Sequence, residues 1–93
     1  MTPLPPGSTI GILGGGQLGR MLAMAAAQIG YRTHVFAPDA DSVAAEVATH
    51  HTRAAYDDEL ALNGFARAVD VVTFEFENVP VDTVRHLEGH VPV

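Results

Sequence analysis

The apolar residues of this chain fall into short continuous runs typical of buried parallel strands, separated by segments in which they recur at helical spacing. The run Val-Val-Thr-Phe-Glu-Phe at 71–76 is the strongest β signal of the sequence. Strands are predicted over residues 9–13, 32–36, 51–55 and 70–76. The final Val91-Pro92-Val93 is typical of the start of a fifth strand.

The first helical segment follows three glycines at 14–16 and ends at Gly30, where the C-cap glycine of a helix belongs. A short Ala-rich helix is predicted further along, over 43–49. Its possible N-caps are Asp39, Asp41 and Ser42. The apolar residues of the first helix predict one stripe packed on the sheet, formed by Leu18, Met21, Leu22, Ala25 and Ile29.

Two further helices are predicted in the second half of the chain. The first begins after Asp57 or Asp58, either of which could be its N-cap. The second starts with Pro80 in its first turn and stops at Gly89. Their predicted apolar faces are Leu62, Phe65, Ala66 and Val69 in the first and Val81, Val84 and Leu87 in the second.

Strands that alternate with helices predict an α/β fold, a Rossmann-like parallel sheet with helices on both faces. Residues 1–8 are expected to form a flexible leader, and residues 9–93 a single domain. Ligands of such sheets bind at the carboxyl ends of the strands, near the switch in strand order. The glycines at 14–16 and the segment Glu75-Phe76-Glu77-Asn78 both follow strands at that edge, so we expect a ligand site there.

Charge and composition narrow the range of partners. The net charge is −6, with eleven acids against five basic residues that are all arginine, which argues against binding to nucleic acid or an anionic membrane surface. There is no cysteine, so disulfides are excluded and a reducing cytosol is permitted. No apolar run approaches the roughly 20 residues that a membrane helix needs. We therefore expect a soluble, cytoplasmic protein.

The glycines after the first strand indicate a binding turn, because glycine lets a ligand approach the main chain closely. The helix start behind them offers unpaired N–H groups and a partial positive charge. Gly14-x-Gly16-x-x-Gly19 also fits the dinucleotide fingerprint, with Asp39 where a ribose-binding acid could sit. The pattern alone leaves open a structural turn, an NAD site, or a site for another anionic or hydrogen-bonding ligand.

Glu75 and Glu77 follow the strongest strand. Residues two apart in an extended chain share a face, so both carboxylates could point the same way while Phe74 and Phe76 pack opposite. Such a pair would repel a pyrophosphate and accept hydrogen bonds from an amine or a sugar hydroxyl. The alternative is that the strand ends early and both acids are solvated, because a buried carboxylate is costly unless it is paired.

Other polar residues point less clearly to a function. Arg20 could balance the charge of a ligand, pair with an acid across the cleft, or lie on the surface. The pairs His50-His51 and His86-x-x-x-His90 lack the accompanying ligands of a metal centre, and no Ser/His/Asp set predicts a nucleophile. We expect neither a metal site nor catalytic residues in this chain.

Three segments together resemble a known family. They are Gly-Ile-Leu-Gly-Gly-Gly-Gln-Leu-Gly-Arg-Met-Leu at 11–22, Ala-Ala-Tyr-Asp-Asp at 54–58 and Val-Thr-Phe-Glu-Phe-Glu-Asn-Val-Pro at 72–80. From Ser8 onward the chain is similar to the N-terminal (pre-ATP-grasp) domain of N5-carboxyaminoimidazole ribonucleotide synthetase, the ATPase subunit of phosphoribosylaminoimidazole carboxylase. The resemblance covers a minor part of such an enzyme, so we expect this chain to stop before the ATP-grasp domain.

The resemblance implies an enzyme of de novo purine biosynthesis that uses ATP and bicarbonate, through carboxyphosphate, to carboxylate the exocyclic amine of 5-aminoimidazole ribonucleotide. ATP and Mg²⁺ would bind to the missing domains, and the chain alone would bind neither and be inactive. The whole enzyme would be a homodimer. The ribonucleotide-binding residues that the resemblance implies are Gly15, Gly16, Gln17, Leu18, Glu75 and Ser42. Glu75 would hold the amine, with Glu77 as the alternative contact, and Ser42 would reach the phosphate.

Three other functions stay open. A formate-dependent glycinamide ribonucleotide formyltransferase is similar, but tends to have Glu in place of Gln17 and Lys in place of Arg20. An NAD(P)-binding module, such as the first half of a dehydrogenase, would explain the glycines and Asp39. The third is a non-catalytic piece that binds a nucleotide or a partner protein.

Overall fold

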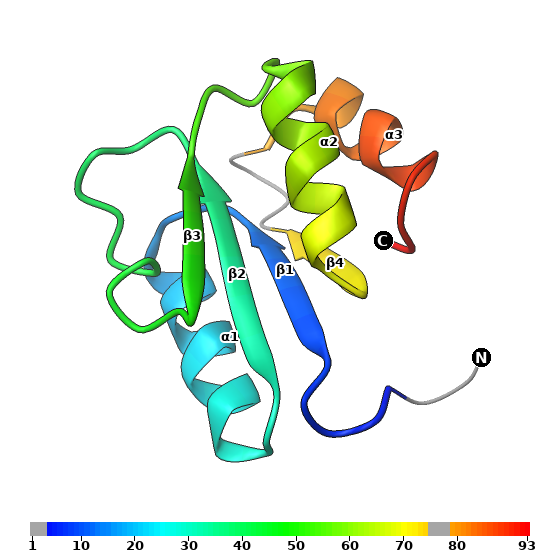
Figure 1. Ribbon diagram of the computed structural model, residues 1–93. Helices are drawn as coiled ribbons and strands as arrows, with labels where there is room; N and C mark the ends of the chain where they lie inside the picture. The colour runs from blue at the N-terminus through cyan, green and yellow to red at the C-terminus, as the bar shows by residue number, and fades with distance from the viewer. Residues whose placement is uncertain (1–3, 75–78) are drawn as a thin grey trace.

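Parallel strands form the centre of the molecule (Figure 1). In the computed structural model, which describes residues 4–74 and 79–93, they are β1 (Thr9–Leu13), β2 (Arg32–Ala37), β3 (His50–Arg53) and β4 (Val71–Phe74). The described sheet has the order β3-β2-β1-β4, and every pairing in it is parallel. The predicted parallel sheet is confirmed, although residues 75 and 76, predicted to end its last strand, lie outside the described residues.

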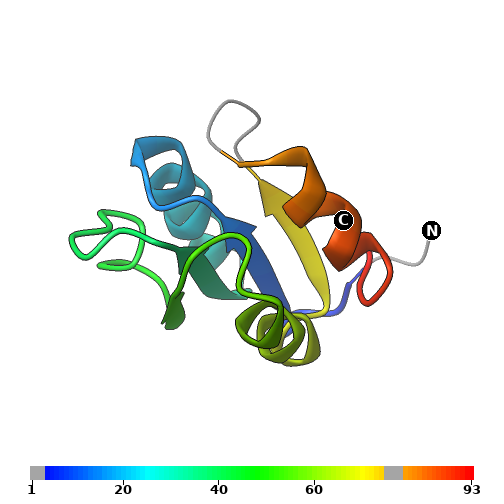
Figure 2. The same cartoon turned by 90° about the horizontal axis from the view of Figure 1, so that it is seen from above.

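Helices cover both faces of the sheet, as predicted (Figure 2). Helix α1 (Gln17–Gln28) lies on one face, and α2 (Glu59–Ala68) and α3 (Val81–Glu88) lie on the other. The larger core fills the space under α2 and α3, with Leu13 and Phe36 of the sheet packed against Phe65 and Leu87. A smaller core on the α1 side is built from Ile12, Val35 and three alanines.

The predicted apolar stripe of α1 is confirmed only for Leu22, which packs against the core on this side of the sheet. The residues of α1 that are buried are Gly19, Ala23 and Ala26. Three large residues of the predicted stripe point outward instead, with Leu18 53%, Met21 59% and Ile29 66% exposed. Small residues at these three buried positions let the helix lie close to the strands.

Two other predictions about helices need correction. The segment 43–49 forms turns instead of a helix, and its Ala44 is buried against the sheet on the α1 side. In α3 the buried face is Thr83, Val84 and Leu87, whereas Val81, predicted to be buried, is 62% exposed. The Thr83 hydroxyl is accommodated because it donates to the carbonyl oxygen of Tyr56 at 2.8 Å.

The predicted ends of the helices agree well with the structure. Gly30 follows α1 with φ +92°, and the N–H of Tyr31 donates to the carbonyl oxygen of Ala26, as in a Schellman motif. Helix α3 starts after Pro80 and ends before Gly89. Residues 91–93 form no strand, but the carbonyl oxygen of Pro92 accepts a hydrogen bond from the N–H of Val72 in β4 at 2.8 Å.

The N-cap of α2 is Asp58 and not Asp57, because the Asp58 carboxylate accepts the N–H of Ala61 at 3.0 Å. Replacing Asp58 with alanine removes this acceptor, and we expect the free energy of unfolding to fall by about 1 kcal/mol. Asp57→Ala is the matched control, since it removes a neighbouring exposed acid and should change stability by less than about 0.5 kcal/mol. Urea denaturation of both variants checks the assignment, and equal losses would contradict it.

His34 makes the stability of the folded state depend on pH. It lies on β2 opposite His50 of β3, its Nε2 is 2.7 Å from Thr52 Oγ1, and its ring meets the Phe65 ring edge-on at 5.1 Å. Burial, and then the charges of His50 and His51, hold the pKa of His34 below its ordinary value. The unfolded chain therefore takes up this proton first as the pH falls, so the folded state loses stability from about pH 7 downward.

Replacing His34 with glutamine is expected to reduce this loss. The urea midpoint of each protein is measured between about pH 7.5 and pH 5.5, above the range where carboxylates titrate. The slope of the midpoint against pH gives the pH dependence of stability. His90→Gln, at an exposed position after α3, should leave this pH dependence of the urea midpoint unchanged. A His34→Gln variant with the slope of the unmodified protein would refute the role of this residue.

Candidate substrate-binding site at the glycine turn

The turn between β1 and α1 is shaped by its glycines. Gly14 has φ +121°, a backbone conformation that residues with a β-carbon rarely adopt. Its N–H donates to the carbonyl oxygen of Phe36 at 3.0 Å, which ties the turn to the end of β2. Gly16 is the N-cap of α1 and has no side chain to cap the helix, and the first turn carries no acid.

Backbone N–H groups of the turn and of the first two residues of α1 therefore stay available as donors. Within residues 4–74 and 79–93, no acceptor receives the backbone N–H of Gly15, Gly16, Gln17 or Leu18. Unpaired N–H groups at a helix N-terminus, together with the helix dipole, attract anions and hydrogen-bond acceptors. The turn can thus bind a phosphate, carboxylate or carbonyl group, as expected from the glycines. Which ligand atoms these four residues contact stays a prediction.

The glycine turn also lies where the strand order reverses. From β1 the chain runs to β2 and β3 on one side of the sheet and later returns to β4 on the other side of β1. Leu13, the last residue of β1, pairs with Phe36 on one side and with Phe74 on the other. A ligand crevice is expected at such a switch point, beyond the carboxyl ends of the strands.

The acidic corner falls outside the described residues. Glu75 and Glu77 belong to the segment 75–78, so their roles as substrate contacts stay predictions. Phe74, the last described residue before them, lies beside Leu13 and therefore next to the start of the glycine turn. The described ends of β1 and β4 are thus neighbours, as the expected site requires.

Ser42 lies behind the turn. It is buried, its hydroxyl donates to the carbonyl oxygen of Gly15 at 3.1 Å, and its Oγ accepts the N–H of Ala45 at 3.1 Å. The sequence predicted Ser42 as a phosphate contact, which stays a prediction. It did not predict the contact with Gly15, because residues 27 positions apart leave no local pattern.

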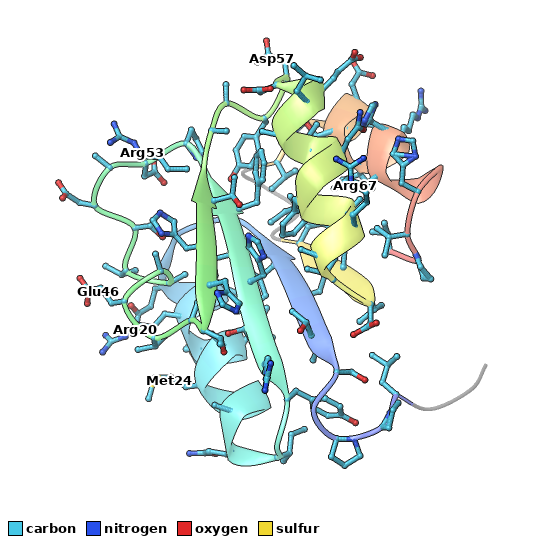
Figure 3. The ribbon with its side chains drawn as sticks, viewed as in Figure 1. Arg20, Met24, Glu46, Arg53, Asp57 and Arg67 are labelled. Carbon is cyan, nitrogen blue, oxygen red and sulfur yellow. The ribbon has the colours of Figure 1, made fainter. Side chains whose placement is uncertain are left out.

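The guanidinium group of Arg20 has a nitrogen without a hydrogen bond among the described residues. The side chain is half-buried on α1, and this nitrogen, Nε, is buried. Figure 3 shows Arg20 and Met24 on the side of the sheet covered by α1, whereas Asp57 and Arg67 lie on the side of α2. Of the roles considered for Arg20, the structure selects none.

A separate cavity of about 340 Å³ lies between α2 and α3. Carboxylates of Asp57, Glu59 and Asp82 line it beside Leu62 and His86, so its charge disfavours a phosphate. The His86 Nε2 is 2.7 Å from Asn63 Oδ1 and is thus already hydrogen-bonded within the fold.

The described residues hold no group of three or more His, Asp or Glu side chains that could bind a metal ion. Nor is any described helix both long and apolar enough to span a membrane.

Known proteins match almost the whole length of this chain. The chain is 60% identical over 86 residues to N5-carboxyaminoimidazole ribonucleotide synthase of Brucella melitensis, a match that covers 92% of this chain and 24% of that protein. The structure of N5-carboxyaminoimidazole synthetase from Staphylococcus aureus complexed with ADP superposes with a TM-score of 0.91 at 41% identity, over 99% of this chain and 25% of that one.

A third protein has been solved with two small molecules. The enzyme of Aspergillus clavatus, in complex with ADP and 5-aminoimidazole ribonucleotide, has a TM-score of 0.77 at 32% identity, over 92% of this chain and 23% of that one. The chain thus spans about a quarter of the length of these proteins. Residues 7–93 match the family model of the ribonucleotide synthetase preATP-grasp domain, and the chain belongs to that family.

Proposed function

We propose that the whole protein carrying this chain is a cytoplasmic ligase of de novo purine biosynthesis. It carboxylates 5-aminoimidazole ribonucleotide with ATP and bicarbonate, giving N5-carboxyaminoimidazole ribonucleotide. One observation carries the proposal: the unpaired N–H groups of the glycine turn lie at the switch point of a fold shared with an enzyme solved with this ribonucleotide. The lack of cysteine is compatible with a reducing compartment.

The domain's part in this reaction is to bind and orient the ribonucleotide. The N–H groups of Gly15, Gly16, Gln17 and Leu18 donate to oxygen atoms of the ligand at the helix N-terminus. The carboxylate of Glu75 accepts hydrogen bonds from the exocyclic amine and turns its nitrogen toward the carboxyl donor. Because the nucleophile is held in place before it reacts, this contribution is one of position.

The rest of the reaction belongs to the rest of the protein. ATP phosphorylates bicarbonate, and the amine nitrogen attacks the carboxyl carbon of the resulting carboxyphosphate. Phosphate leaves, and the nitrogen loses a proton. As the family resemblance implies, Mg²⁺ and the nucleotide bind outside this domain, and the 93-residue chain alone is inactive.

The test is ATP hydrolysis by the full-length protein with bicarbonate, with and without 5-aminoimidazole ribonucleotide. We expect ADP release to require the ribonucleotide and the 93-residue chain to release none. Activity with glycinamide ribonucleotide and formate instead, or enhanced NADH fluorescence on binding, would overturn the proposal in favour of the other functions considered. Turnover by the isolated chain would refute its inactivity.

The resemblance also suggests that the full-length enzyme is a homodimer. Sedimentation velocity of the full-length protein tests this directly. A single species with the mass of one chain, at micromolar concentration, would contradict it.

A further inference from the structure

Two donors from the segment that follows β2 hold the carbonyl group of Gly15. The Ser42 hydroxyl donates to this oxygen at 3.1 Å, and the N–H of Ala44 donates to it at 3.2 Å. Ser42 itself is 6% exposed, and its Oγ also accepts the N–H of Ala45. One peptide group of the turn is thus bonded to a part of the chain that lies 27 residues away in sequence.

The space around Gly15 is also tightly packed. A β-carbon at this position would lie 2.6 Å from Ser42 Oγ and 2.9 Å from the Ala37 side chain. There is thus no room for a side chain at Gly15, and the two hydrogen bonds oppose a shift of the turn away from Ser42. The peptide group between Gly15 and Gly16 is held in one orientation.

This orientation determines where a donor of the site points. In a trans peptide the carbonyl oxygen and the following N–H point in opposite directions, and no cis peptide occurs among the described residues. Because the Gly15 oxygen points to Ser42 and Ala44, the N–H of Gly16 points away from them. This N–H has no acceptor within the described residues, so it is free to meet a ligand.

We propose that Ser42 is a positioning residue for the ribonucleotide, acting through the Gly15 backbone and not by touching the ligand. The inference rests on the function proposed above, in which the N–H groups of the turn bind the ribonucleotide. It assigns to Ser42 a role different from the phosphate contact expected from the sequence. The two roles make different predictions for variants.

The first test is kinetic and uses the full-length protein. Ser42→Ala is expected to raise KM for 5-aminoimidazole ribonucleotide about fivefold, as for one weakened hydrogen bond, with KM for ATP unchanged. Thr33→Val is the matched control: Thr33 is 1% exposed, its Oγ accepts the N–H of Thr49, and it pairs with Ile10 at the other end of β1. The control should leave the ribonucleotide KM within about twofold. If both variants raised the ribonucleotide KM equally, Ser42 would contribute only to the stability of the fold. That result would overturn the proposal.

A double-mutant cycle separates the two roles of Ser42. Gly15→Ala displaces the turn by itself, so adding Ser42→Ala to it should raise the ribonucleotide KM by less than about twofold further. A further increase of about fivefold, the full effect of Ser42→Ala alone, would mean that Ser42 contacts the ligand directly. That outcome would overturn the positioning role.

A third measurement does not depend on the proposed function. Ser42→Ala should accelerate hydrogen exchange at the Ala44 amide, whose acceptor is the Gly15 carbonyl oxygen, and Thr33→Val should leave that amide unchanged. An Ala44 amide that stays equally protected in Ser42→Ala would overturn the proposal. A full-length protein that shows this acceleration but no turnover of the ribonucleotide would refute the proposed function alone.

Discussion

Replacing Phe65 with alanine is expected to lower the free energy of unfolding of this domain by about 4 kcal/mol. The Phe65 side chain is 1% exposed at the centre of the larger core. Its ring lies over Gly11 of β1, where a β-carbon would come within 2.6 Å of it, and is tilted against the Phe36 ring at 5.4 Å. Truncation leaves a cavity that these rigid neighbours cannot fill.

Urea denaturation at neutral pH measures this loss. Leu60→Ala on the same helix is the control, because the Leu60 side chain is 85% exposed and its removal should cost less than about 0.5 kcal/mol. If Phe65→Ala does not fold, Phe65→Leu should still fold and lose about 1 kcal/mol. Losses for the Phe65 variants no larger than that of the control would show that the core is not organised around this ring.

In the full-length protein, Glu75→Gln is expected to lower kcat/KM for 5-aminoimidazole ribonucleotide about a hundredfold, while KM for ATP stays unchanged. Glutamine keeps the size of the side chain but removes its charge and half of its acceptor capacity. The proposed carboxylate contact with the amine would therefore lose most of its strength. Steady-state kinetics with either substrate varied measures both constants.

Glu88→Gln is the matched control, since Glu88 is an exposed acid at the end of α3. It should leave both constants within about twofold. Unchanged kinetics in Glu75→Gln would mean that the acidic corner is solvated and has no part in the site. The same comparison with Glu77→Gln decides which of the two acids is the main contact.

The strands and the helix ends were predictable because their signals are local. Continuous apolar runs, Gly30 in a positive-φ conformation and Asp58 at an N-cap each depend on a few neighbouring residues. The inner face of α1 was predicted wrongly because large residues dominate a hydrophobic pattern. The alternative pattern of Gly19, Ala23 and Ala26 was present in the sequence, but it has meaning only once the helix is known to lie close to the sheet.

The candidate site was predictable only in part. The glycine turn at the switch point followed from the sequence, because glycines between an apolar strand and a helix are typical of a ligand-binding turn in this class of fold. The segment 43–49 looked helical because alanine favours helices, yet Ala44 instead lies against the sheet and donates to the turn. The bond between Ser42 and Gly15 joins residues far apart in sequence, so only the folded arrangement reveals it.

The polar edge of the sheet has a consequence for self-association. Strand β3 has only four residues, His-His-Thr-Arg, and none of them is buried. A second molecule that paired with this edge would gain backbone hydrogen bonds but would cover hardly any apolar area. The strand therefore acts as a gatekeeper against edge-to-edge aggregation.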